Sequence, residues 1–204
     1  MCEFTYEPSE QRTPLETFEW DNTWIERAPR DDVPRLLYIG DSISCGTRRL
    51  ITECSEKSWL CDGYGSSKAL DNPFLFESIR LFTAQQNRCD AVLFNNGLHG
   101  WHLDDESEYP VLYEHTVRFL REEFARTPLF LVLTTSVADA AREARVMARN
   151  AAAREVAARY DLPVIDLYAV SVDKVDCRLP DGVHYSQAGY QSFADAILAQ
   201  VTKQ

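Results

Sequence analysis

Length, composition and charge limit the class of protein before any motif is considered. The chain has 204 residues, of which 45% are hydrophobic and 26% are charged, as is typical of one globular domain. Its 32 acidic residues exceed its 21 basic residues, which gives a formal net charge of −11. Such a surface repels phosphodiester backbones, so we expect no nucleic-acid partner.

The N-terminal residues and the cysteines indicate the compartment. Residues 1–20 contain neither a basic segment nor an apolar segment of the kind found in signal peptides. No run of about 18 apolar residues predicts a transmembrane helix, so we expect no membrane partner. The 6 cysteines are scattered and form no CxxC pair. We therefore expect a cytoplasmic protein with reduced thiols, while its oligomeric state stays open.

The N-terminal segment differs in composition from the rest of the chain. Residues 1–34 are polar and contain prolines, but aromatic residues such as Trp20 and Trp24 are spaced to pack against a surface. We interpret this segment as an arm laid across a single domain formed by residues 35–204. The arm has room for a short strand.

Beyond the arm, short apolar runs alternate with longer amphipathic ones. We predict strands, in chain order, at residues 35–39, 91–94, 129–133 and 163–166, and helices at residues 73–86, 110–126, 138–160 and 187–201. Continuous apolar strands that alternate with helices are typical of a parallel sheet covered on both faces. In such α/β folds the reactive site lies at the carboxyl ends of the strands.

The first polar motif, Gly40-Asp41-Ser42, follows the first predicted strand directly. Gly40 allows a sharp turn, and Ser42 then lies at a helix N-terminus, where the helix dipole favours a developing negative charge. Aspartate and serine are also good helix caps. This motif alone therefore leaves a nucleophilic serine and a structural cap equally open.

The second motif, Asp181-Gly182-Val183-His184, precedes the last predicted helix. Its spacing lets the Asp181 carboxylate fold back onto the His184 ring. There it would fix the tautomer and stabilise the imidazolium that forms when His184 takes the proton of Ser42. A lone histidine is more often a surface or core residue, but the combination with the first motif favours catalysis.

The third motif is the run NNGLHGWH at residues 95–102, after the second predicted strand. Amide and imidazole N–H groups at a strand end can donate hydrogen bonds to an oxyanion. A polar turn with Asn-Gly chemistry is the structural alternative. His99 and His102 also form an HxxH pair, but no carboxylate or cysteine stands at a convincing third-ligand spacing, so we expect no metal.

Together the three motifs resemble the GDSL/SGNH hydrolase superfamily, because they lie between Arg35 and Tyr190 in the order of that family: first Gly40-Asp41-Ser42, then residues 95–102, then Asp181–His184. The resemblance implies that Ser42 is the nucleophile and that its own N–H is an oxyanion donor. It also implies that His184 is the general base and that Asp181 orients it. The implied fold is α/β, a flavodoxin-like three-layer α/β/α sandwich with a parallel sheet of about five strands.

The oxyanion-hole residues follow the family pattern less closely. The second block of the family supplies a glycine N–H, and in the run CDGYGSS we favour Gly65 over Gly63 for this role. The third block reads GxND in the family, whereas residues 97–100 here place His99 where the asparagine stands. The resemblance therefore implies that either His99 or Asn96 donates to the oxyanion. The NNGLHGWH run resembles a bacterial subgroup of the superfamily.

The resemblance implies a serine esterase that needs no cofactor. We expect a short-chain ester, an acetyl ester in particular, on a carbohydrate or a similar small molecule. Trp101 can stack on a sugar ring, although packing in the core is an equal alternative. A lysophospholipase, a thioesterase or an acyltransferase would use the same triad, and the fold alone can serve a non-catalytic glycan-binding module.

Overall fold

A mixed sheet forms the middle of the molecule. The computed structural model describes residues 14–103 and 107–203, and no helix in these ranges is long and apolar enough to cross a membrane. The sheet has six strands in the order β1-β3-β2-β4-β5-β6. The strands are β1 (Asp21–Trp24), β2 (Arg35–Gly40), β3 (Leu60–Ser66), β4 (Ala91–Phe94), β5 (Leu129–Val132) and β6 (Val164–Ile165). Strand β1, at the edge, pairs antiparallel with β3, whereas the pairs among β2 to β6 are parallel.

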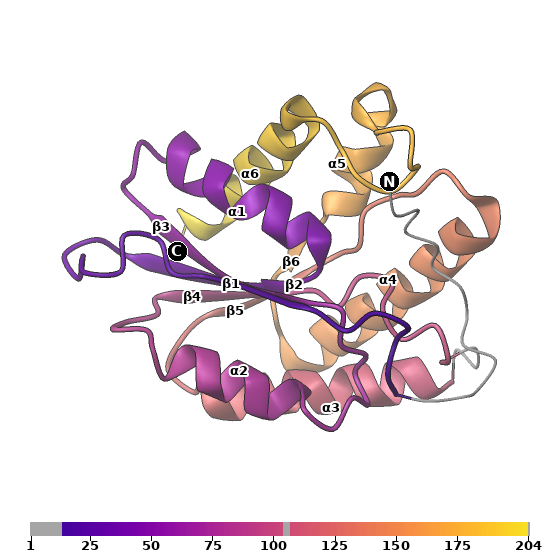
Figure 1. Cartoon of the computed structure of the whole chain (residues 1–204), viewed down its shortest axis with the longest axis horizontal. Helices are drawn as coiled ribbons and strands as arrows, with labels where there is room; N and C mark the ends of the chain where they lie inside the picture. The colour runs from indigo at the N-terminus through magenta and orange to yellow at the C-terminus, as the bar shows by residue number, and fades with distance from the viewer. Residues whose placement is uncertain (1–13, 104–106, 204) are drawn as a thin grey trace.

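Helices cover both faces of the sheet. They are α1 (Ser42–Cys54), α2 (Leu75–Thr83), α3 (Glu108–Glu123), α4 (Ala140–Tyr160), α5 (Leu167–Val172) and α6 (Gln187–Val201), with a 3₁₀ turn at Val175–Cys177. Figure 1 shows α1, α5 and α6 on one side of the sheet and α2, α3 and α4 on the other. Each layer of helices encloses its own apolar cluster against the sheet. The fold is therefore the three-layer α/β/α sandwich that the sequence predicted.

The strand order determines where a ligand site can form. Numbered along the chain without β1, the parallel strands have the order 2-1-3-4-5, which is the flavodoxin-like order. The order reverses between β2 and β4, and in such sheets the crevice for ligands lies at the carboxyl ends of the strands that flank this reversal. Ser42 follows β2 and Asn95 follows β4. Both polar motifs therefore begin at the switch point of the sheet.

Strand β3 has a composition that did not predict it. Its sequence LCDGYGS contains a carboxylate and glycines, yet all of its residues are buried. The Asp62 carboxylate is fully buried because the Arg35 guanidinium lies 2.8 Å away. A Cβ atom on Gly65 would lie 2.2 Å from the Cys45 Sγ atom of α1. The glycine thus permits the helix to pack closely on this strand.

Part of the N-terminal segment belongs to the sheet. Residues 21–24 of the expected arm form β1 and pair with β3. The Arg35 guanidinium also donates to the carbonyl oxygens of Glu26, Arg27 and Arg30, at distances of 2.7–3.0 Å. One buried arginine on β2 therefore ties the segment that follows β1 to the sheet.

Candidate active site

Ser42 is the first residue of α1, and its hydroxyl does not cap this helix. The N-cap is Asp41, whose side chain accepts a hydrogen bond from the Ile43 N–H at 2.9 Å. The Ser42 Oγ atom lies instead 2.8 Å from the His184 Nε2 atom. Asp41 is therefore the helix cap, and the Ser42 hydroxyl lies within hydrogen-bonding distance of a histidine that can act as a base.

A tight turn joins Asp181 to His184. One carboxylate oxygen of Asp181 accepts the backbone N–H groups of Val183 and His184, both at 2.8 Å. The other oxygen lies 3.1 Å from the His184 Nδ1 atom. Gly182 has φ +77°, and its carbonyl accepts the Ala138 N–H at 2.8 Å, which ties the turn to the segment after β5. The backbone thus fixes the direction in which the histidine ring points.

Electrostatics keeps Asp181 ionised. Partial burial opposes its charge, but the N–H groups of His184 and Val183 and the His184 imidazole outweigh that burial and hold the pKa of Asp181 below its ordinary value. A carboxylate that accepts from Nδ1–H leaves the Nε2 lone pair of a neutral imidazole directed at the Ser42 hydroxyl. The three residues therefore form a continuous chain from carboxylate to imidazole to hydroxyl, in the arrangement that activates a serine.

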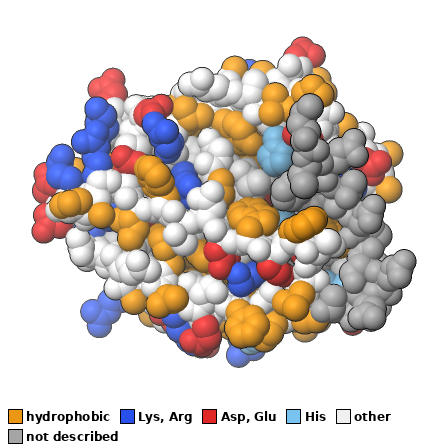
Figure 2. Space-filling model, viewed as in Figure 1, with side chains coloured by type: hydrophobic (Ala, Val, Ile, Leu, Met, Phe, Trp, Pro, Cys, Tyr) orange, Lys and Arg blue, Asp and Glu red, His pale blue; other side chains and the backbone are white. Residues whose placement is uncertain are grey.

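A pocket opens beside Ser42 and is lined by both predicted and unpredicted residues. Of the predicted site residues it contains Ser42, His99 and Trp101, and Asp41, Leu98 and Val183 of the same three motifs line it as well. The lining residues from outside the motifs are Ile43, Thr134, Thr135, Val137 and Arg142. Figure 2 shows a histidine side chain at the surface with apolar side chains next to it. Ser42 thus lines a partly apolar pocket.

The structure does not bring Gly65 or Asn96 into the lining of this pocket. Gly65 lies within β3, where it is paired with Gly40 of β2 on one side and with Asn22 of β1 on the other. The sequence patterns did not predict this strand, and the role of Gly65 as an oxyanion donor stays a prediction. Asn96 is buried and donates its amide to the Lys68 carbonyl at 3.1 Å, which links the loops after β3 and β4.

His99 lines the same pocket as Ser42. Its ring Nδ1 atom lies 3.1 Å from a carboxylate oxygen of Glu16, and its carbonyl accepts the Arg149 guanidinium at 2.7 Å. The ring also packs edge-on against Trp20, with centroids 5.8 Å apart. Of the two residues considered as the side-chain oxyanion donor, His99 is the one that lines the pocket.

The two histidines of the HxxH pair do not share a ligand site. His99 faces Glu16, whereas His102 lies 2.9 Å from a carboxylate oxygen of Asp71. In the part of the chain that the structure describes, no group of three histidine, cysteine or acidic side chains could hold a metal ion.

Trp101 lines the pocket, but arginines pack against its ring. The guanidinium carbons of Arg142 and Arg145 lie 5.5 Å and 5.2 Å from the ring centroid. Such contacts stabilise the position of the indole. Stacking of Trp101 on a sugar ring remains a prediction.

Arginines of α4 organise the loop that contains His99, and no pattern in the sequence indicated this role. Arg149 is 1% exposed and donates to the carbonyls of Gly97, His99 and Gly100 at 2.7–3.2 Å. Arg145 donates to the carbonyls of Gly100, Trp101 and Leu103. In the sequence these residues were indistinguishable from ordinary helix formers. Glu16 was missed as well, because its partner lies 83 residues further along the chain.

Comparison with known proteins gives matches among solved structures. No family model matches the sequence, and no curated protein matches it. The chain is similar to a lipase/acylhydrolase from Enterococcus faecalis, with a TM-score of 0.65 and 20% identity, over 84% of this chain and 96% of that chain. It is also similar to a lipolytic protein of the G-D-S-L family from Veillonella parvula, with a TM-score of 0.66 and 16% identity, over 84% of this chain and 100% of that chain. A third similar structure is a catalytic mutant of an acetylxylan esterase from Geobacillus stearothermophilus, with a TM-score of 0.62 and 18% identity, over 82% of this chain and 94% of that chain. The chain therefore shares the fold of the G-D-S-L lipolytic protein, the acylhydrolase and the acetylxylan esterase.

Proposed function

We propose that the protein is a serine esterase of the GDSL/SGNH type that works through an acyl-serine intermediate. The hydrogen-bonded chain Asp181–His184–Ser42 is the observation that supports this proposal most strongly, with contacts of 3.1 Å and 2.8 Å. It lies at the switch point of a flavodoxin-like sheet, where ligand sites of such folds occur. Similarity to solved acylhydrolases and acetylxylan esterases supports the same reaction class.

The proposed reaction has two steps. In the first, His184 Nε2 takes the Ser42 proton while the serine oxygen attacks the ester carbonyl, and the imidazolium then gives that proton to the departing alcohol. In the second, His184 takes a proton from water, the hydroxide attacks the acyl-serine, and the proton returns to Ser42 as the acid leaves. Asp181 keeps the ring oriented and balances the charge of the imidazolium in both steps.

The negative charge on the carbonyl oxygen needs donors within the pocket. The Ser42 N–H belongs to the first turn of α1, where backbone N–H groups have no partner within the helix. His99 supplies the side-chain donor in place of the asparagine of the family, since its ring lines the same pocket as Ser42. Loss of one such donor is expected to lower kcat roughly 10²–10³-fold.

For the substrate we propose a short acyl ester, with acetyl preferred, of a carbohydrate or a similar polyol. Leu98 and Val137 give the pocket apolar lining beside Ser42, and Trp101 offers an aromatic surface at the same place. Acetylxylan esterases among the similar solved structures support this choice. No cofactor takes part in either proposed step.

Turnover of acetyl, butyryl and octanoyl esters tests both the reaction and the substrate class. We expect hydrolysis that falls with acyl length and that the Ser42→Ala variant loses. A preference for octanoyl esters would favour a lysophospholipase or thioesterase instead. Acyl transfer to an added alcohol in place of water would favour an acyltransferase. Specific glycan binding by a folded protein without any ester turnover would contradict the esterase and favour a binding module.

A further inference from the structure

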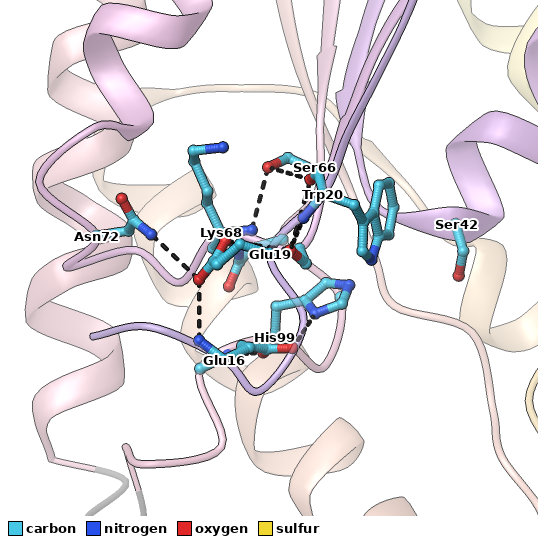
Figure 3. Close-up of polar contacts among 12 residues, drawn as sticks. Glu16, Glu19, Trp20, Ser42, Ser66, Lys68, Asn72 and His99 are labelled. Carbon is cyan, nitrogen blue, oxygen red and sulfur yellow. Dashed lines mark hydrogen bonds and ion pairs between the residues drawn. The ribbon is translucent and has the colours of Figure 1, made fainter. Parts of the chain in front are cut away.

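The N-terminal segment supplies a buried carboxylate to the proposed oxyanion site. Glu16 lies ahead of β1, and the exposed fractions of the Glu16 and His99 side chains are 9% and 7%. One Glu16 oxygen accepts the Gly100 N–H at 2.8 Å, and the other lies 3.1 Å from His99 Nδ1. Figure 3 shows Nδ1 turned toward Glu16 and the rest of the ring turned to the side on which Ser42 lies.

The segment that contains Glu16 is held in place by further contacts. The Glu16 N–H donates to the Glu19 carboxylate at 2.9 Å, and Glu19 in turn accepts from Ser67 and Asn72. The Trp20 N–H donates to the Ser67 Oγ atom at 2.8 Å. These contacts fasten the segment to the loop after β3, so Glu16 meets His99 in a fixed geometry.

The number of protons on the Glu16–His99 pair decides what the second ring nitrogen can do. An ionised Glu16 beside a neutral imidazole accepts a hydrogen bond from Nδ1–H. The Nε2 atom of that imidazole then carries a lone pair, which would repel an oxyanion. With one more proton, the pair is either carboxylate and imidazolium or carboxylic acid and imidazole. These two forms differ only in the position of the proton between Oε2 and Nδ1, and in both of them Nε2 carries a hydrogen.

We propose that Glu16 is a positioning residue that holds this additional proton on the pair, so that the His99 Nε2–H donates to the oxyanion of the reaction. The inference rests on the proposed esterase function and adds a residue from outside the three sequence motifs. An asparagine amide always carries donor hydrogens, whereas a histidine donates from Nε2 only when that nitrogen carries a hydrogen. The oxyanion itself also favours the form of the pair that holds the additional proton, since its negative charge develops beside the imidazole.

Other charged groups surround His99 and contribute to the electrostatic environment of the Glu16–His99 pair. Arg149 donates to its carbonyl, Asp41 and Arg142 line the same pocket, and His184 stands opposite at Ser42. Lys68 is paired with Asp21, and Asp71 is paired with His102. Within residues 14–103 and 107–203, Glu16 is the carboxylate that contacts the ring itself.

The proposal predicts a specific pH dependence of ester hydrolysis. In the wild type, kcat falls at alkaline pH as the pair loses its additional proton. In Glu16→Gln the amide accepts from Gly100 and donates to Nδ1, so Nε2–H persists without charge. We expect its kcat to be roughly tenfold below the wild type near neutral pH, with KM unchanged and with the alkaline fall abolished.

Further variants separate this role from simple anchoring of the segment. Glu16→Asp retains a carboxylate, so its kcat should still fall at alkaline pH. Glu16→Ala should move this fall in kcat to lower pH, and its kcat should be below that of Glu16→Gln. His99→Asn, a neutral donor, should also lack the fall. Glu19→Gln alters the neighbouring contacts of the same segment but leaves the Glu16–His99 contact, so it should keep the wild-type profile.

The outcomes distinguish the inference from the function on which it rests. Absence of any Ser42-dependent turnover in the folded wild type would overturn both. Ser42-dependent turnover with the same pH profile in wild type, Glu16→Gln and His99→Asn would overturn the inference alone. NMR of the His99 imidazole, assigned with His99→Asn, gives a readout without substrate. A ring that loses its second proton at the same pH in wild type and Glu16→Ala would also overturn it.

Discussion

Replacement of Arg149 by methionine tests how the loop that contains His99 is held in place. The side chain is 1% exposed, and its guanidinium donates to the carbonyls of Gly97, His99 and Gly100. Methionine fills a similar volume but donates no hydrogen bond. The Gly100 carbonyl keeps its hydrogen bond from Arg145, but the carbonyls of Gly97 and His99 lose their donor. Each carbonyl left without a partner in the interior costs about 1 kcal/mol or more, so the variant should lose at least about 2 kcal/mol of unfolding free energy.

Thermal unfolding of the purified variant measures this loss. For a chain of this length a loss of about 2 kcal/mol lowers Tm by roughly 4–8 °C. Arg154→Met on the same helix is the matched control, because its ion pair with Asp166 is half-exposed and is worth under about 1 kcal/mol. Equal Tm values for Arg149→Met and Arg154→Met would refute the conclusion that Arg149 holds the loop.

Three further predictions concern single groups. In Asp181→Asn the amide would donate to His184 Nδ1, which puts the proton on Nε2, so kcat should fall roughly 10²–10⁴-fold; an unchanged kcat would exclude Asp181 as the orienting residue. The pKa of Asp181 is lower in the folded state than in the unfolded state, so its ionised carboxylate stabilises the fold at pH values above the unfolded pKa of about 3.9. This contribution disappears as the pH falls through the folded pKa. Urea unfolding of wild type and Asp181→Asn across this range should therefore give a difference in free energy that shrinks toward acid, and a difference that grows there would contradict the assignment. Burial raises the pKa of the Cys61 thiol well above its ordinary value and that of Cys89 to about 12, so mass spectrometry should find both unmodified by iodoacetamide at neutral pH until urea is added.

Much of the fold was predictable from periodicity and apolar runs. The predicted strands and helices all occur, and their ends differ by a few residues at most, as for the helix predicted at 73–86 and observed at Leu75–Thr83. Strand β3 was missed because Asp62 makes it look polar, and that charge is tolerated only through Arg35. A distant ion pair of this kind leaves no mark in the local pattern.

The candidate site was predictable where its geometry is local. The Asp181–His184 turn spans four residues, so its spacing alone indicated that the carboxylate reaches the ring. Contacts that join distant segments were not predictable in this way. Glu16 meets His99 across 83 residues, and the position of Gly65 depends on a strand that the pattern did not reveal.

The central claim is that Ser42 is a nucleophile, and covalent labelling with a fluorophosphonate tests it most directly. The account predicts one covalent adduct on the wild type, at Ser42, and none on Ser42→Ala. Ser44→Ala is the matched control, because the hydroxyl of that buried serine donates to the Asp41 carbonyl at 2.7 Å and should be dispensable for labelling. An adduct on folded Ser42→Ala, or no adduct on the folded wild type, would contradict the claim.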